Sequence, residues 1–193
     1  MKGRESGMPD EAVWRTFFAT DCVVERMDCA PTGQESVLEF GCGYGTFTLP
    51  VARRTRGVVH ALDIDVDRVN ELRERARAEG LMNLRVTERD FLENGTGLPA
   101  ACVDHAMIYN LLHIEQPLSL LSEAWRVLRP GGGLSVIHWN HDPRTPRGPP
   151  LDIRPRPGQC RGWAEAVGFM WVDSPVLGAC APHHYGLVFN KSS

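Results

Sequence analysis

Short apolar runs alternate along the chain with segments in which apolar residues recur at helical spacing. Runs suited to β-strands occupy residues 35–40, 57–63, 84–87, 103–109, 134–139, 169–174 and 185–190. Two of the intervening segments, 66–80 and 118–128, carry apolar residues three or four positions apart and predict amphipathic helices. This alternation predicts an α/β fold, with a doubly wound, mostly parallel sheet covered by helices on both faces.

Two further segments flank the alternating region. Residues 11–27 read as helical, and we expect residues 1–34 to form a helical lid over the sheet edge. Residues 141–157 are rich in proline and arginine and follow the fifth strand, which places them on the substrate side. Because this stretch is too short for a domain linker, we expect residues 1–193 to form a single domain.

A glycine cluster, Gly41, Gly43 and Gly45, joins the first strand to a helix that begins near Thr46. Glycine allows a sharp turn with positive φ and lets the backbone come close to a ligand. The helix N-terminus then offers free N–H groups to a negative group. In open parallel sheets, ligands bind in this strand-to-helix crevice.

The residues around the glycines distinguish between two nucleotide cofactors. Asp63 ends the second strand about 20 residues past the loop, where a carboxylate can accept hydrogens from both hydroxyls of a ribose. Both NAD and S-adenosylmethionine carry such a ribose. A dinucleotide loop reads Gly-x-Gly-x-x-Gly, but here the third glycine is Gly45 and position 46 is Thr. Glu39, two residues before the first glycine, suits an ammonium and would repel a pyrophosphate.

Residues 37–45 resemble motif I of the class I S-adenosylmethionine-dependent methyltransferases. Further resemblances follow in the family's order. Residues 62–65 resemble its second motif and residues 89–91 its adenine-contacting segment. Residues from 103 onward resemble its fourth strand, and residues 126–132 resemble the turn that follows its next helix. The match runs from about residue 35 to 139 and is closest to the ubiquinone and menaquinone methyltransferase branch. It implies a Rossmann-like, seven-stranded sheet whose antiparallel last strand lies between the fifth and the sixth.

The resemblance also implies how the cofactor S-adenosylmethionine is held. The backbone of Gly41, Gly43 and Gly45 would pass along it, and Glu39 would face its methionine end. Asp63 would hold the ribose hydroxyls, although it could instead cap the helix that begins near residue 66.

For the adenine, the resemblance implies three contacts. Ile64 would pack on the ring, Asp90 would accept its amino group and Phe91 would flank it. Asp90 could instead only terminate a strand, and Phe91 could be a core aromatic. Asn110, just past the fourth strand, would lie beside the methionine end and the acceptor.

Methyl transfer needs a base only if the acceptor must lose a proton. Polar side chains stand at the ends of the fourth and fifth strands, residues 109–113 and 138–142. If the last strand lies beside the fifth, its first residues reach the same edge. We therefore expect the side chains of His138, His184, Tyr185 and Asn110 to gather at this edge and form the opening of the active site, called the catalytic mouth below, unless these histidines lie on the surface. His138, His141, Asp142 and His184 match no standard zinc spacing, so we predict transfer without a metal.

The acceptor is expected to be a small molecule. Residues 109–112 read Tyr-Asn-Leu-Leu instead of the Asn-Pro-Pro-Tyr or Asp-Pro-Pro-Tyr signature of enzymes that methylate adenine or glutamine. The arginines of the 141–157 segment could grip an anionic acceptor or could be solvated; they are Arg144, Arg147, Arg154 and Arg156.

Composition and charge limit the partners and the cellular compartment that we expect for this protein. The net charge of −3 lacks the basic excess of a nucleic-acid binder. No apolar run is long enough to span a membrane and residues 1–9 lack the apolar core of a signal peptide, so we expect a cytoplasmic monomer or homodimer without nucleic-acid or membrane partners. The six cysteines are scattered without a Cys-x-x-Cys pair, which favours reduced thiols.

Two other functions stay open. One is an NAD- or nucleotide-sugar-dependent oxidoreductase, against which Glu39 and Thr46 argue. The other is a non-catalytic protein that binds the cofactor on the same fold.

Overall fold

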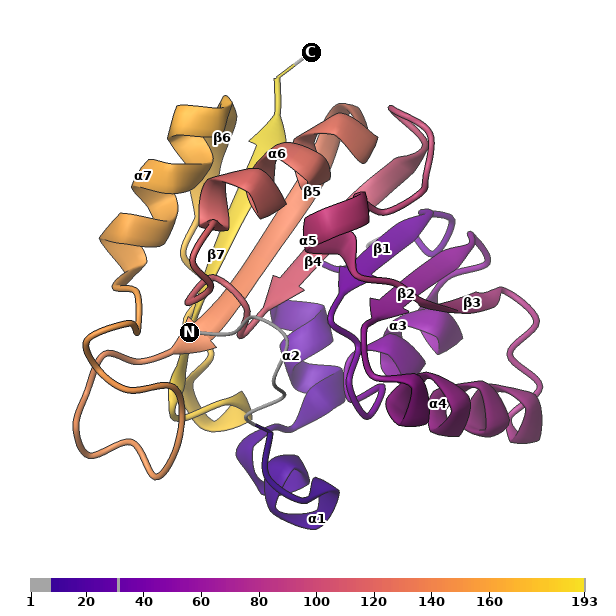
Figure 1. Ribbon diagram of the computed structural model, residues 1–193, viewed down its shortest axis with the longest axis horizontal. Coiled ribbons are helices and arrows are strands. Elements are labelled where there is room, and N and C mark those ends of the chain that lie inside the picture. The colour runs from indigo at the N-terminus through magenta and orange to yellow at the C-terminus, as the bar shows by residue number, and fades with distance from the viewer. Residues whose placement is uncertain (1–7, 31, 193) are drawn as a thin grey trace.

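The computed structural model describes residues 8–30 and 32–192, which fold around a seven-stranded sheet (Figure 1). The strands are β1 (Val37–Phe40), β2 (Val59–Asp63), β3 (Leu84–Glu88), β4 (Val103–Tyr109), β5 (Leu128–Trp139), β6 (Phe169–Asp173) and β7 (His184–Lys191). Their order is β3-β2-β1-β4-β5-β7-β6, and β7 runs antiparallel to β5 and β6 while the other pairs are parallel. The predicted Rossmann-like sheet is confirmed.

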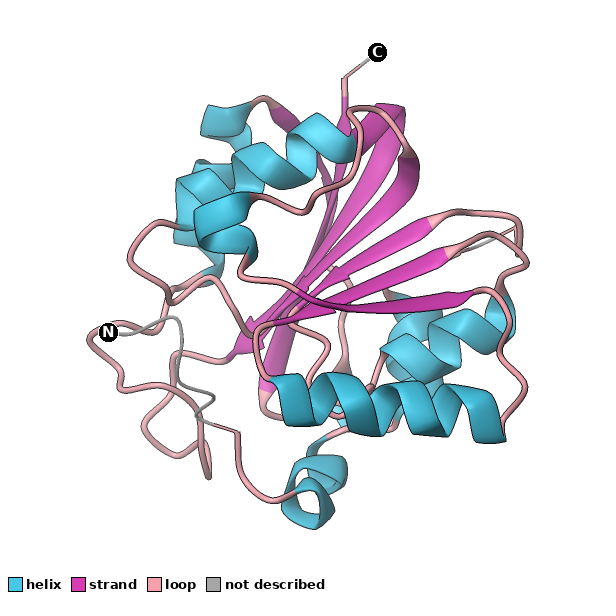
Figure 2. Ribbon diagram, turned by 45° about the vertical axis from the view of Figure 1, so that its right-hand side comes forward, coloured by secondary structure: helices cyan, strands magenta, loops and turns pink. Residues whose placement is uncertain are grey.

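Helices cover both faces of this sheet (Figure 2). One face carries α2 (Thr20–Arg26), α3 (Thr48–Arg54) and α4 (Val66–Ala78), and the other carries α5 (Phe91–Asn94), α6 (Pro117–Val127) and α7 (Pro157–Val167). Short elements complete the chain: α1 (Glu11–Trp14), the 3-10 turn η1 (Arg15–Phe17) and a second such turn η2 (Gly178–Cys180). Each face buries its own apolar core, because successive side chains of a strand point to opposite sides.

The sequence explains where α4 begins and ends. The side chain of Asp65 accepts hydrogen bonds from the N–H groups of Asp67 and Arg68, so it caps the helix. Of the predicted stripe Val66, Val69, Leu72 and Ala76, the last three are buried, whereas Val66 in the first turn is 46% exposed. Asp65, and not Asp63, therefore supplies the helix cap, which leaves Asp63 to other partners.

The apolar spacing of residues 118–128 predicts that Leu118, Leu121, Trp125 and Leu128 share one face toward the core. The buried residues of α6 are Leu120, Leu121, Ala124 and Val127. Leu121 is therefore confirmed, but Leu118 is 46% exposed, so the prediction for Leu118 is wrong. The spacing 120, 121, 124 and 127 fits one face of a helix, and Leu118 lies outside that face in the first turn. Strand β5 also begins earlier than predicted, at Leu128, because the residues after α6 continue directly into the sheet.

The predicted helix over residues 11–27 is broken. Phe18 adopts an extended backbone with φ −140° and ψ 128°, which separates α1 and η1 from α2. The break lets aromatic side chains of the N-terminal segment pack together over the ends of the strands: the Phe18 ring centroid lies 5.0 Å from that of Trp14 and 5.0 Å from that of Phe47. Tertiary packing therefore overrides helix propensity here.

The prediction of six reduced cysteines is wrong for one pair. Cys22 of α2 and Cys180 of η2 form a disulfide, with their Cα atoms 5.8 Å apart across a sequence separation of 158 residues. The fold packs α2 against η2, a long-range contact that cysteine spacing does not reveal. The other four are free thiols: Cys29, Cys42, Cys102 and Cys160.

Among the described residues, no helix has both the length and the apolar character that crossing a membrane requires.

Candidate active site

The glycine loop lies where the sequence predicts, between β1 and α3. Gly41, Gly43 and Gly45 have φ values of +69°, +50° and +75°, a region that favours glycine. A Cβ at position 45 would lie 2.3 Å from Cδ1 of Leu72 in α4, so a side chain there would have to displace the buried side chain of Leu72. The side chains of Leu111, Met8 and Leu72 lie close to the three glycines at the carboxyl edge of the sheet.

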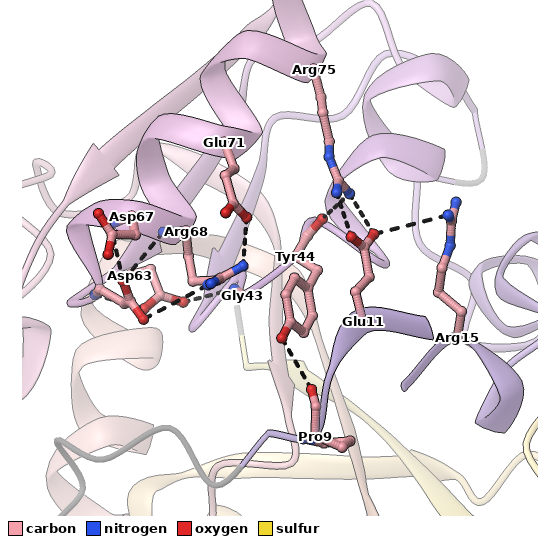
Figure 3. Close-up of polar contacts among 11 residues, drawn as sticks. Pro9, Glu11, Arg15, Gly43, Tyr44, Asp63, Asp67, Arg68, Glu71 and Arg75 are labelled. Carbon is pink, nitrogen blue, oxygen red and sulfur yellow. Dashed lines mark hydrogen bonds and ion pairs between the residues drawn. The ribbon is translucent and has the colours of Figure 1, made fainter. Parts of the chain in front are cut away.

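Asp63 ties this loop to the end of β2. Its Oδ2 accepts a hydrogen bond from the N–H of Gly43 at 2.7 Å, and its Oδ1 accepts one from the N–H of Asp65 at 3.0 Å (Figure 3). A carboxylate oxygen has room for a further donor beyond one N–H. Asp63 can therefore hold the loop and still accept hydroxyl groups from a ligand.

Glu39 is a buried carboxyl group beneath the same loop. It is 2% exposed and accepts a hydrogen bond from the hydroxyl of Thr48, at the start of α3. Burial raises the pKa of Glu39 to about 8, and the nearby charge of Asp63 adds to this effect. No lysine or arginine within residues 8–30 and 32–192 forms an ion pair with it. A cationic ligand group would supply the missing partner.

Asn110 carries two signs of a ligand-binding residue. Its φ is +57°, a strained value for a residue other than glycine, while its N–H donates to the carbonyl of Ile137 at 2.7 Å. The Oδ1 and Nδ2 atoms of its side chain are buried without a hydrogen-bond partner. An unpaired buried polar group costs roughly 1–3 kcal/mol, so such a group in a folded protein calls for an explanation. A ligand beside the glycine loop would satisfy both atoms.

The three residues predicted to contact the adenine lie after β2 and β3, and two of them have structural contacts within the protein. Ile64 follows β2 and is 36% exposed, so it can pack on a ring. Asp90 caps α5 by accepting from the N–H of Glu93 at 3.2 Å. The ring of Phe91 lies edge-on to that of Phe40, with centroids 5.3 Å apart, so it also belongs to the core.

The predicted catalytic mouth is divided between the two faces of the sheet. In the register of β5 and β7, His138 pairs with Tyr185 and Trp139 pairs with His184. Because neighbouring positions point to opposite faces, His138 and Tyr185 lie toward α6 and α7 while His184 lies toward the N-terminal segment. The prediction that all three side chains gather in one mouth is wrong.

His184 and Tyr185 each have structural surroundings. The ring centroid of His184 lies 4.5 Å from that of Phe18 and 4.2 Å from that of Trp139. Burial lowers the pKa of His184 to about 3, so the ring is neutral near pH 7. The Tyr185 hydroxyl donates to the carbonyl of Pro155 at 3.0 Å, which favours an anchoring role for this side chain.

Two of the arginines considered for an anionic acceptor are already engaged. Arg154 is 7% exposed, and its guanidinium donates to the carbonyls of Pro149 and Asn140 at 2.7 and 2.9 Å. Arg144 pairs with Asp142 at 2.7 Å. Arg154 therefore fixes the 141–157 segment from inside, a structural role that the composition of the segment does not reveal.

His113 ends the polar stretch after β4, residues 109–113, but it is not among the predicted catalytic residues. Its Nδ1 lies 3.2 Å from Nε2 of His138, and the two rings are nearly perpendicular. The available signal was its position three residues after Asn110, in the segment that follows β4. Among the described residues, no group of three His, Cys, Asp or Glu side chains is arranged to hold a metal ion.

The N-terminal segment is fastened over the glycine loop (Figure 3). Arg75 of α4 forms a two-pronged ion pair with Glu11, and one of its N–H groups also donates to the carbonyl of Tyr44. The Tyr44 hydroxyl donates to the carbonyl of Pro9 at 3.0 Å. Of the predicted lid, residues 1–7 and 31 lie outside the described residues.

Comparison with known proteins agrees with this arrangement. Residues 37–132 match a family model described as a methyltransferase domain. The chain superposes on a SAM-dependent methyltransferase from Aquifex aeolicus with a TM-score of 0.79, 22% identity and coverage of 94% of each chain. The family match assigns residues 37–132 to the methyltransferase-domain family, and the chain has the Rossmann-like fold of the class I methyltransferases.

Three curated relatives are similar over part of their length. An uncharacterized protein in a transposon of Streptomyces fradiae is 32% identical, covering 77% of this chain and 45% of that protein. Aklanonic acid methyltransferase from Streptomyces sp. is 30% identical, covering 54% and 48%. Demethylmenaquinone methyltransferase from Tropheryma whipplei is 31% identical, covering 58% and 45%. The chain thus spans less than half the length of each of these relatives.

The buried carboxyl of Glu39 leads to a prediction for stability. Its folded pKa of about 8 lies above the ordinary value of 4.5, so the folded state favours the neutral form and loses stability as pH rises between these values. Glu39→Gln should therefore be more stable than the natural protein by about 1–4 kcal/mol at pH 8, with the difference shrinking toward pH 4. Urea unfolding at both pH values measures this. An equal difference in unfolding free energy at the two pH values would contradict the conclusion that Glu39 is buried and neutral.

Asp63 leads to a prediction for binding. Asp63→Ala should weaken S-adenosylhomocysteine binding by about 1–3 kcal/mol, because ligand hydroxyls lose a charged acceptor and the loop loses its tie to β2. Isothermal calorimetry measures the affinity. Asp67→Ala is the matched control, since Asp67 is exposed in the first turn of α4 and its replacement should leave binding unchanged. Equal affinities for Asp63→Ala and the natural protein would remove Asp63 from the site.

Proposed function

We propose that this protein transfers the methyl group of S-adenosylmethionine to a small-molecule acceptor at the carboxyl edge of its sheet. The observation that carries the proposal is the set of unsatisfied polar groups beside the glycine loop. Glu39 is a buried carboxyl without a cation, and both polar atoms of the Asn110 side chain are buried without a partner. S-adenosylmethionine carries an ammonium and a carboxylate on its methionine end, which match these groups in kind.

The proposed binding mode follows the edge of the sheet from β4 to the end of β3. Glu39 and Asn110 face the methionine end, and the backbone of residues 41–45 passes beside the ligand. Asp63 accepts the ribose hydroxyls with the lone pairs that its two backbone N–H donors leave. Ile64, Asp90 and Phe91 surround the adenine. Asp90 and Phe91 fulfil this role in addition to capping α5 and packing on Phe40.

Bound S-adenosylmethionine would supply an electrophilic methyl group on a sulfonium. The protein's own contribution is to align the acceptor with it and to exclude water. The N-terminal segment supports the second task, because the Glu11–Arg75 ion pair and the bond from Trp14 to Thr46 hold it over the glycine loop. We propose that residues 1–34 act as a lid and residues 141–157 border the acceptor within one domain.

The class of acceptor is supported by the relatives. Aklanonic acid methyltransferase and demethylmenaquinone methyltransferase are both named for small molecules. The second relative also supports the proposed similarity to the menaquinone branch. Arg144 and Arg154 are occupied by protein groups, so they give no support to an anionic acceptor.

A metabolite screen tests this function. The protein is incubated with S-adenosylmethionine and a desalted small-molecule extract, and mass spectrometry follows products that gain one methyl group. We expect such a product with the natural protein and none with Gly45→Val, whose side chain would collide with Leu72 and distort the cofactor loop. Thermal melting checks that the variant folds. Failure of the folded natural protein to bind S-adenosylhomocysteine at millimolar concentration would refute the proposal.

A further inference from the structure

A surface cavity of about 620 Å³ lies on the face of the sheet that α6 and α7 cover. Residues 112–119, which follow β4, form most of its wall, and Ile153 and Trp163 complete it. A second cavity of about 580 Å³ shares Ile153 and Trp163 with the first, and its other lining residues lie between 141 and 159, Arg154 and Arg156 among them. Most of the first wall is aliphatic or aromatic, which suits a ligand with an apolar, flat body.

This cavity adjoins the candidate active site through His113. His113 lies in the cavity wall, and its Nδ1 is 3.2 Å from Nε2 of His138. His138 lies at the end of β5 beside Asn110, whose N–H donates to the preceding residue, Ile137. The pair of imidazoles therefore lies between the cavity wall and the end of β5, whose backbone is bonded to that of Asn110.

The surroundings of His113 keep its ring neutral. Burial lowers the pKa of His113 to about 4, and the positive charge of Arg154 acts in the same direction. The charged and titratable groups that face it are His138 from β5 and Arg154 from the 141–157 segment, and Glu115 lies in the same cavity wall. Near pH 7 the ring is therefore neutral, so one of its two nitrogens carries a lone pair.

His138 can decide which nitrogen of His113 accepts that proton. The imidazole of His138 is fully buried, and its Nδ1 has no hydrogen-bond partner of normal geometry. When His138 carries its hydrogen on Nδ1, its Nε2 accepts from Nδ1–H of His113. The free lone pair of His113 is then on Nε2, away from His138, because a neutral imidazole has one donor and one acceptor nitrogen.

We propose that this cavity binds the methyl acceptor, a planar hydroxylated aromatic compound, and that His113 is its catalytic base while His138 is a positioning residue. The inference rests on the proposed methyltransferase function. An apolar wall with one imidazole and no free arginine among its lining residues fits a neutral hydroxyl on an aromatic body better than an aliphatic amine or an anion.

The proposed step transfers the methyl group to the oxygen of an acceptor hydroxyl. The acceptor oxygen forms a bond to the methyl carbon as the carbon–sulfur bond breaks, and the electron pair of that bond stays on sulfur. The acceptor proton moves to Nε2 of His113. The products are a methyl ether, S-adenosylhomocysteine and an imidazolium, which releases its proton to solvent readily because burial disfavours its charge.

The test uses 2-naphthol as the probe and its saturated analogue, decahydro-2-naphthol, as the comparison ligand. Calorimetry in the presence of S-adenosylhomocysteine measures binding of each compound, and mass spectrometry detects 2-methoxynaphthalene formed from S-adenosylmethionine. We expect 2-naphthol to bind more tightly than the analogue and to be methylated. Trp163→Ala and Ile153→Asp should weaken its binding and leave S-adenosylhomocysteine affinity unchanged.

Substitutions of the two histidines separate their roles. His113→Gln should lower kcat by about 10²–10⁴-fold, the usual contribution of a general base, with a small change in KM. His138→Leu should lower kcat less, and His138→Gln, which keeps a polar partner for His113, should restore most of it. His60→Gln on β2 is the matched control and should leave kcat unchanged. Thermal melting confirms that each variant folds.

Each negative outcome has a separate meaning. If S-adenosylhomocysteine does not bind, the proposed function itself fails. If it binds and 2-naphthol does not, or if Trp163→Ala and Ile153→Asp leave 2-naphthol affinity unchanged, the assignment of the cavity is wrong. Binding without methylation by the natural protein, or full activity of His113→Gln, overturns the role of His113.

Discussion

The N–H of Gly43 donates to the carboxylate of Asp63, and this hydrogen bond joins the loop after β1 to the end of β2. It forms only because glycine can adopt the positive φ that turns this N–H toward the neighbouring strand. The same carboxylate accepts from Asp65, which in turn caps α4. Loop, strand and helix are therefore held in one arrangement at the carboxyl edge of the sheet.

Unsatisfied polar groups concentrate along this edge. Glu39 has no cation, Asn110 is strained with both side-chain atoms unpaired, and Nδ1 of His138 lacks a partner. Each costs stability in the free protein, and other buried polar side chains of the same strands are paired, as in the bond of His105 to Ser135. Their common location is the physical reason to place the cofactor and the acceptor on either side of Asn110.

The local sequence pattern was sufficient to predict the sheet, the glycine loop and the position of Asp63. Strand periodicity and the placement of glycines depend only on neighbouring residues. The local pattern was insufficient for contacts that depend on packing between distant segments. The Cys22–Cys180 disulfide, the buried Arg154 and the His113–His138 pair all join residues far apart in the chain. The order of the strands was anticipated, but the side of the sheet to which His184 points depends on register, and a shift of one residue reverses it.

The most direct test of the account concerns the proton on Glu39. Because its pKa is about 8 in the free protein, Glu39 is mostly protonated at pH 7, and an incoming ammonium should lower that pKa. Calorimetry of S-adenosylhomocysteine binding at pH 7, in buffers of different ionisation enthalpy, counts the protons exchanged. We predict the release of close to one proton by the natural protein and none by Glu39→Gln. Binding without proton release, or equal release by both proteins, would contradict the placement of the methionine end beside Glu39.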